Sequence, residues 1–259
     1  LIKALCIWLG VVELFGHSVS FSKATLVVDF VVMAAVLIWR PWGLLGRPQG
    51  RSRHTGEAEA PLRPAGSVYK LVVAVLLAGL VALPWLSSSP YAVVLATDLA
   101  LAALFAASLH FIMGPGGMHS FGHAAYFSLG AYGAGLVLTA LGLPMEVALV
   151  VGPLVAAVGA AVFGWFAVRL SGVYLAMLTL AFAQIAWAVT YQWDDLTGGS
   201  NGLTGVWPAE WLSDNRSYYW LALALVAIGV LALRHMLFSP FGYALRAGRD
   251  SPLRADAIG

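Results

Sequence analysis

The sequence predicts an all-α, polytopic transmembrane helical bundle. Hydrophobic residues make up 61% of the 259 residues and charged residues only 10%, and the mean hydropathy is +0.86. A soluble domain has about 45–50% apolar and about 25% charged residues, so this chain has too few charges to cover a surface that faces water. Its apolar runs are continuous rather than alternating, which favours helices over a membrane β-barrel.

Individual spans are predicted from runs of about 20 apolar residues, the length that crosses the hydrocarbon core. Candidate spans lie at residues 3–16, 22–39, 69–86, 91–113, 120–141, 145–168, 172–192 and 217–237. The first two are short. The chain begins with a leucine and has no signal-peptide pattern before an apolar run, so we expect it to be a fragment of a longer protein.

The distribution of Lys and Arg predicts the orientation of the spans. Basic residues are concentrated in 40–70 and again after 237, whereas 193–216 is mostly acidic. We therefore expect a multi-pass protein of the cell (inner) membrane whose segment 40–68 and C-terminal end are cytoplasmic. The six spans predicted between the two basic regions agree, because an even number returns the chain to the same side. Segment 40–68 is rich in Pro, Gly and charge, and is either a disordered linker between two membrane units or a long loop within one unit.

The run from Gly117 to Gly135, "GMHSFGHAAYFSLGAYGAG", combines a helix break with small residues. Small residues four positions apart allow helix backbones to approach closely in lipid; those expected at such a packing surface are Gly130, Ala131, Ala134 and Gly135. The preceding glycines and proline at 114–117 are expected to break or kink a helix, which at membrane depth is tolerated only against protein or a water-filled path. Two interpretations remain open: close helix packing alone, or a permeation path lined by Ser120, Gly122 and His123.

The histidines of this run do not form a predicted metal site. His119 and His123 are four residues apart, but no H-E-x-x-H pattern or carboxylate partner accompanies them. The single cysteine, Cys6, excludes a disulfide framework and cysteine-based metal sites. We predict no metal and no cofactor, and a net charge of +2 is too small to indicate nucleic-acid binding.

A second glycine-rich stretch, "LTGGSNGLTG" at 196–205, lacks the Lys-Ser/Thr pair that a nucleotide-binding P-loop requires. It is either a flexible turn or an external vestibule. In the second case a zwitterionic solute contacts backbone N–H groups and the side chains of Ser200, Asn201 and Thr204.

Charged residues are scarce within the predicted spans, and Asp98 is the best placed of them. A proton- or sodium-coupled carrier usually pairs ionisable groups in mid-helix, so the scarcity indicates that the energy for any transport comes from elsewhere. The final stretch, 239–259, mixes Leu, Ala and Ile with Arg and Asp. It is either an interfacial loop or a set of short helices that docks a soluble partner.

Three ordered segments resemble one family. They read "GMHSFGHAAYFSLGAYGAGLV", then "RLSGVYLAMLTLAFAQI" followed by "WDDLTGGSNGLTGV", and finally "SPFGYALRAGRDSPLRADAIG". They are similar to the LivM-type permeases, the membrane subunits of branched-chain amino acid ABC transporters. The earlier segment "VVDFVVMAAVLIWRPWGLLGR" resembles the tail of the sister LivH-type permease. The resemblance implies a LivH–LivM fusion fragment: LivH-like helices at 1–39, a cytoplasmic linker at 40–68, and a C-terminally incomplete LivM-like unit at 69–259.

The resemblance implies a permease subunit, not an enzyme, of an ABC importer for branched-chain or other hydrophobic amino acids. Its implied partners are a periplasmic or extracellular binding protein, a second permease unit, membrane lipid, and ABC ATPase subunits that hydrolyse the ATP. The coupling residues it implies are Arg246, Arg249, Asp256 and Gly259.

The match to the family has departures. The family commonly has Ala-Ala-Glu-Ala where this chain has Arg-Ala-Asp-Ala at 254–257, and His119 has no counterpart, whereas Ser120, Gly122 and His123 match. Urea and short-amide ABC permeases share these motifs and stay an alternative, as does an ion-coupled secondary carrier.

Overall fold

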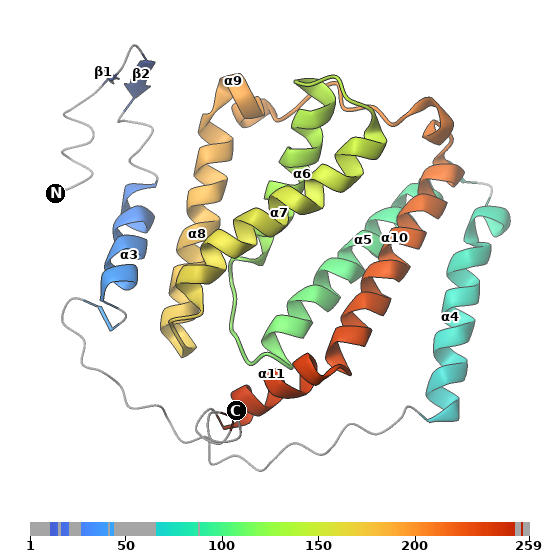
Figure 1. The fold of residues 1–259 in the computed structure, drawn as a ribbon. Helices are drawn as coiled ribbons and strands as arrows, with labels where there is room; N and C mark the ends of the chain where they lie inside the picture. Colours follow the sequence, from blue (N-terminus) through green and yellow to red (C-terminus); the bar gives the residue numbers. More distant parts are fainter. Residues whose placement is uncertain are drawn as a thin grey trace. The chain divides into compact units, whose positions relative to one another are not determined.

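The computed structural model describes residues 11–14, 17–20, 27–40, 42–43, 66–87, 89–251 and 255. Within these ranges the regular secondary structure is helical apart from one short pair of strands (Figure 1). Five of the described helices are long and apolar enough to cross a membrane: α4 (Ser67–Leu86), α5 (Pro90–Met113), α7 (Met145–Ala167), α8 (Gly172–Gln192) and α10 (Asn215–Leu237). The predicted all-α, polytopic membrane fold is confirmed.

Proline and glycine explain why several of these helices begin where they do. Pro90 is the first residue of α5 and Pro144 immediately precedes α7; proline suits a helix start because its fixed φ is helical and its missing N–H would have no intrahelical partner. α8 begins at Gly172, which has a φ of +58°. The observed bounds of the five long helices differ from the predicted spans by two residues or fewer.

The helix α6 (His123–Thr139) is shorter than the predicted span 120–141. Its 17 residues reach about 26 Å at 1.5 Å per residue, less than the roughly 30 Å of a hydrocarbon core. The helix begins three residues later than predicted and ends two residues earlier, with a different reason at each end. Before the helix, the N–H of Phe121 donates to the side chain of Thr179 in α8 rather than to a helical carbonyl, at 3.1 Å. After it, Gly142 takes a φ of +60°, which is unfavourable for other residues and ends the helix.

The N-terminal region differs from prediction as well. Strands β1 (Val11–Leu14) and β2 (His17–Ser20) pair antiparallel, so the predicted helical span 3–16 is wrong over residues 11–14, and its other residues lie outside the described ones. Two β-branched valines open β1, and such residues favour extended backbone. The helix α3 (Val28–Trp39) is the described part of the span predicted at 22–39.

The chain forms two compact units. The first contains residues 1–50 and 118–207, and within it α6 packs most extensively against α7. Its core is centred on α8, where Leu178 and Ala181 are fully buried. Leu37 of α3 packs into the same cluster, and Phe163 of α7 stacks on Phe182 of α8 with ring centroids 4.6 Å apart.

The second unit contains residues 51–117 and 208–259. Here α5 packs against α10, and Gly229 permits the close approach, since a Cβ there would lie 2.8 Å from a side-chain carbon of Leu104. The fully buried Tyr219 of α10 donates its hydroxyl to the carbonyl of Leu80 in α4 at 2.6 Å. The unit also contains the short helices η2 (Glu210–Leu212) and α11 (Pro240–Asp250).

Candidate functional site

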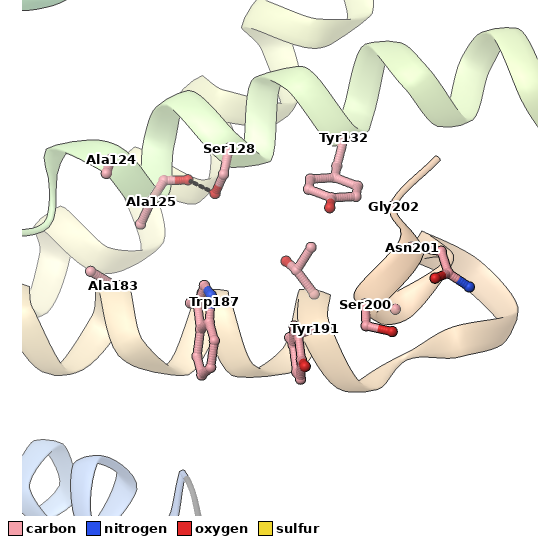
Figure 2. A pocket seen from close by; sticks show the side chains of 12 residues that line it. Ala124, Ala125, Ser128, Tyr132, Ala183, Trp187, Tyr191, Ser200, Asn201 and Gly202 are labelled. Carbon is pink, nitrogen blue, oxygen red and sulfur yellow. Dashed lines mark hydrogen bonds between the residues drawn. The ribbon is translucent and has the colours of Figure 1, made fainter. Parts of the chain in front are cut away.

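A pocket of about 410 Å³ lies within the first unit, between α6, α8 and the short helix η1 (Gly199–Asn201) (Figure 2). This volume falls in the range of roughly 300–1,000 Å³ that is typical of small-molecule sites. The lining residues come from three segments: Ala124, Ala125, Ser128 and Tyr132 of α6, Ala183, Trp187, Thr190 and Tyr191 of α8, and residues 199–202. None of the lining side chains carries a charge.

The pocket is lined by matching faces of the two helices. On α6 the lining positions 124, 128 and 132 are spaced four residues apart, and on α8 the same spacing joins 183, 187 and 191. Residues four apart lie on the same face of a helix, so each helix presents an alanine followed by larger or polar residues. The rings of Trp187 and Tyr191 stack with centroids 5.1 Å apart and planes 14° apart, which gives α8 a flat aromatic surface.

Two pocket hydroxyls already use their protons within their own helices. Ser128 donates to the carbonyl of Ala125 at 2.9 Å, and Thr190 donates to that of Ala186 at 2.8 Å. A hydroxyl has one proton and two acceptor lone pairs. Towards a bound solute, these two side chains therefore act as hydrogen-bond acceptors.

The loop that follows α8 is held together by its own polar groups. After the short helix α9 (Asp194–Thr197), the buried hydroxyl of Thr197 lies 2.5 Å from the carbonyl oxygen of Thr190 and 2.7 Å from that of Trp193. The N–H groups of Asn201 and Gly202 donate to the carbonyls of Gly198 and Gly199, each three residues earlier in the same loop. These two amides are used inside the loop, and the loop also presents the side chains of Ser200 and Asn201 to the pocket.

Only two of the six predicted path residues reach this pocket, namely Ser200 and Asn201. Thr204 is exposed and lies outside the pocket lining. Ser120, Gly122 and His123 lie at the start of α6, also outside the lining. Ser120 and Gly122 are buried, and the ring of His123 meets the ring of Tyr126 edge-on.

The residues predicted to pack helices have different surroundings. Gly130 and Ala134 face Gly152 of α7, where an added Cβ would lie 2.9 Å from the Gly130 carbonyl oxygen and 3.1 Å from the Ala134 Cβ. Gly135 is buried against a loop residue rather than a helix, since a Cβ there would lie 2.7 Å from Leu203. Ala131 is exposed.

The predicted coupling segment forms the helix α11, whose start is capped by Ser239, the acceptor of the Gly242 N–H. Arg246 turns back on the same unit, with its Nε 3.3 Å from the Gly242 carbonyl oxygen and its guanidinium 4.6 Å from the centroid of the Tyr243 ring. The other two predicted coupling residues, Asp256 and Gly259, lie outside the described residues.

Arg249 joins α11 to the glycine-rich turn after α5. Its guanidinium donates to the carbonyl of Gly114 at 2.8 Å and forms an ion pair with Asp250 at 2.8 Å. Its aliphatic part lies against Gly117, where a Cβ would collide with it. Gly117 also has a φ of +62°. Both the backbone conformation and the contact with Arg249 therefore require glycine at this position.

No cluster of three His, Cys, Asp or Glu side chains suited to a metal ion occurs among the residues that the structure describes. The pocket residues that sequence reasoning missed are chiefly Ser128, Tyr132, Trp187 and Tyr191. Their four-residue spacing was visible in the sequence. However, α6 and α8 are apolar around most of their circumference, so no polar face marked the side that lines a pocket.

Comparisons with known proteins found a family model and two relatives that match this chain. Residues 91–259 match a family model described as branched-chain amino acid transport system / permease component. The chain is 25% identical over 217 residues to the high-affinity branched-chain amino acid transport system permease protein LivM of Salmonella typhimurium strain LT2, and equally to the protein of that name from Escherichia coli strain K12.

Each of these alignments covers 73% of this chain and 51% of the relative, so the chain spans about half the length of the curated relatives it matches. No solved structure matches the chain. The family model, by contrast, covers more than half of the chain and includes every residue of the pocket and all of α11. The chain therefore belongs to the family of branched-chain amino acid transport system permease components.

Proposed function

We propose that this chain is part of the membrane permease subunit of an ABC importer that moves branched-chain or other hydrophobic amino acids. The observation that carries the proposal is the family match over residues 91–259. The uncharged pocket between α6 and α8 supports it, because a site without charged side chains suits a solute with no net charge. In this proposal an external binding protein delivers the amino acid, and separate ATPase subunits hydrolyse ATP.

The helix α11 is the proposed contact with the ATPase subunits. It is strongly amphipathic, unlike the long helices, and its last turn carries Arg249. Because Arg249 also bonds to the carbonyl of Gly114, a push on α11 by an ATPase would act directly on the turn that leads out of α5. Such a push works as a switch only if the ATPase binds the two access states with unequal affinity.

We further propose that residues 1–39 belong to a preceding LivH-like unit, joined through the linker 40–68 to the LivM-like residues 69–259. The helix of the first segment, α3, packs on α8 through Ala34 and Leu37. In this arrangement the α3–α8 contact joins two permease units that are separate chains in unfused transporters.

The test is uptake by the full-length permease, reconstituted in proteoliposomes with its binding protein and ATPase subunits. We expect uptake of radiolabelled leucine that requires both ATP and the binding protein. Uptake that persists without ATP and follows an imposed ion gradient would instead support a secondary carrier. ATP-dependent uptake of urea or acetamide with no uptake of leucine would support the short-amide alternative.

A further inference from the structure

The pocket between α6 and α8 differs in character from one end to the other. Figure 2 shows Ala124, Ala125 and Ala183 together at one end, and Ser200 and Asn201 at the opposite end. The helical register agrees with the picture, since on each helix the alanine precedes the last lining aromatic by eight residues, or about 12 Å. One end therefore offers only methyl groups, and the other offers a hydroxyl and an amide.

The middle of the pocket is suited to aliphatic groups. The rings of Trp187 and Tyr191 on α8 are stacked and line the pocket, and Tyr132 projects from α6 towards α8. Beside these rings, Ser128 and Thr190 have only acceptor lone pairs to offer, because their protons go to helix carbonyls. Acceptors suit an ammonium group, whereas a carboxylate needs donors such as the hydroxyl of Ser200 and the amide of Asn201.

We propose that a neutral α-amino acid binds lengthwise in this pocket, with its side chain at the alanine end and its charged groups near Ser200 and Asn201. In this pose Ala183 sets the largest side chain that is accepted. Ala183 is half-buried and lies one helical turn before Trp187, so a larger residue there would extend into the pocket. Ala125 is a poorer determinant because it is only 3% exposed and is already packed against its neighbours. This inference rests on the proposed function.

The test compares uptake of leucine and alanine by the full-length permease complex, with the binding protein saturated by each amino acid in turn. We expect Ala183→Leu to lower leucine uptake relative to alanine uptake by about tenfold or more, because a single methylene group in an apolar pocket already discriminates by roughly 10–200-fold. Ala183→Gly should shift the ratio the other way, towards larger side chains. Asn201→Ala should lower uptake of both amino acids by a similar factor.

Ala157→Leu is the matched control, since Ala157 is exposed on α7 and outside the pocket lining; it should leave the leucine-to-alanine ratio unchanged. An unchanged ratio in both Ala183 variants would overturn the inference, as would a ratio that Ala157→Leu shifts equally. These outcomes are separate from failure of the proposed function, in which the unaltered complex shows no ATP-dependent uptake of either amino acid.

Discussion

Gly122, in the first unit, has surroundings that leave no room for a side chain. A Cβ at this position would lie 2.6 Å from the backbone carbonyl oxygen of Thr179. Backbone of a buried helix cannot move aside as a flexible side chain can. The same segment is held by the hydrogen bond from the Phe121 N–H to the Thr179 hydroxyl. The start of α6 is thus held against α8 by a hydrogen bond and by close backbone packing.

We predict that Gly122→Ala destabilises the protein by roughly 1–3 kcal/mol, the usual cost of overpacking. The measurement is the midpoint of thermal unfolding of the detergent-solubilised full-length protein, followed by size-exclusion chromatography. Gly164→Ala is the control, because Gly164 lies inside α7 with open space around its Cβ position, and alanine is the better helix former there. Equal midpoints for the two variants would contradict the assigned packing.

Some individual residues have neighbours that the sequence could not predict. The small residues at 130 and 134 were expected to pack against a helix, and in the structure they lie against Gly152. Gly135 and Ala131 belong to the same pattern, yet one lies against a loop and the other is exposed. Spacing places these residues on faces of a helix, but only the neighbouring elements determine what each face meets.

Among the elements, α11 has the clearest mechanical role. Gly114 and Arg249 are 135 positions apart in the sequence, and the fold brings them into hydrogen-bond contact. The turn at 114–117 is also where the chain passes from the second compact unit to the first. A displacement of α11 would therefore act on one of the segments through which the chain passes between the units.

We predict that Arg249→Ala lowers the amount of amino acid transported per ATP hydrolysed by about tenfold, because a hydrogen bond to a charged group contributes about 1.5–3 kcal/mol. The measurement is uptake and ATPase activity in the same reconstituted full complex. Arg249→Lys should recover part of the coupling, since it keeps the charge but loses the planar fork of donors.

Arg169→Ala is the control for this experiment. Arg169 and Trp165 both belong to the first unit, and the guanidinium of Arg169 lies over the Trp165 ring, 5.4 Å from its centroid. The control therefore also removes an arginine that is engaged in a contact, but one away from α11. Coupling that falls equally in the Arg169 and Arg249 variants would remove the special role assigned to the contact with Gly114.

At the scale of the whole molecule, the helices expose large apolar surfaces that would be unfavourable in water but are stable against lipid. The most hydrophobic stretch of α4 is only 6% buried, and large apolar side chains such as Leu71 and Trp85 are more than 60% exposed. A bilayer covers such surface without a hydrophobic penalty. The short helix α6 raises a separate question, because the number of crossings depends on whether it passes fully through the membrane.

We predict six crossings between the linker and the C-terminal end, so that both face the cytoplasm. The test uses single cysteines at Gly56→Cys, Thr204→Cys and Ala247→Cys, in a full-length protein from which Cys6 and every cysteine outside these 259 residues have been removed. A membrane-impermeant maleimide should label intact cells or spheroplasts only at position 204, and the other two positions only after permeabilisation. Opposite-side labelling of positions 56 and 247 would indicate that α6 does not complete a crossing.

The sequence by itself determined the membrane class, the five long helices and the interruption before α6. These follow from local properties: a run of about 20 apolar residues can only cross a bilayer as a hydrogen-bonded helix, and Gly114–Gly117 disfavours helix wherever it occurs. The tertiary structure alone decided that Trp187 and Tyr191 line a pocket and that Arg249 contacts Gly114. When a helix in lipid is apolar on every side, its sequence does not show which face packs against other helices. The choice of face and partner then depends on packing between segments far apart in the chain.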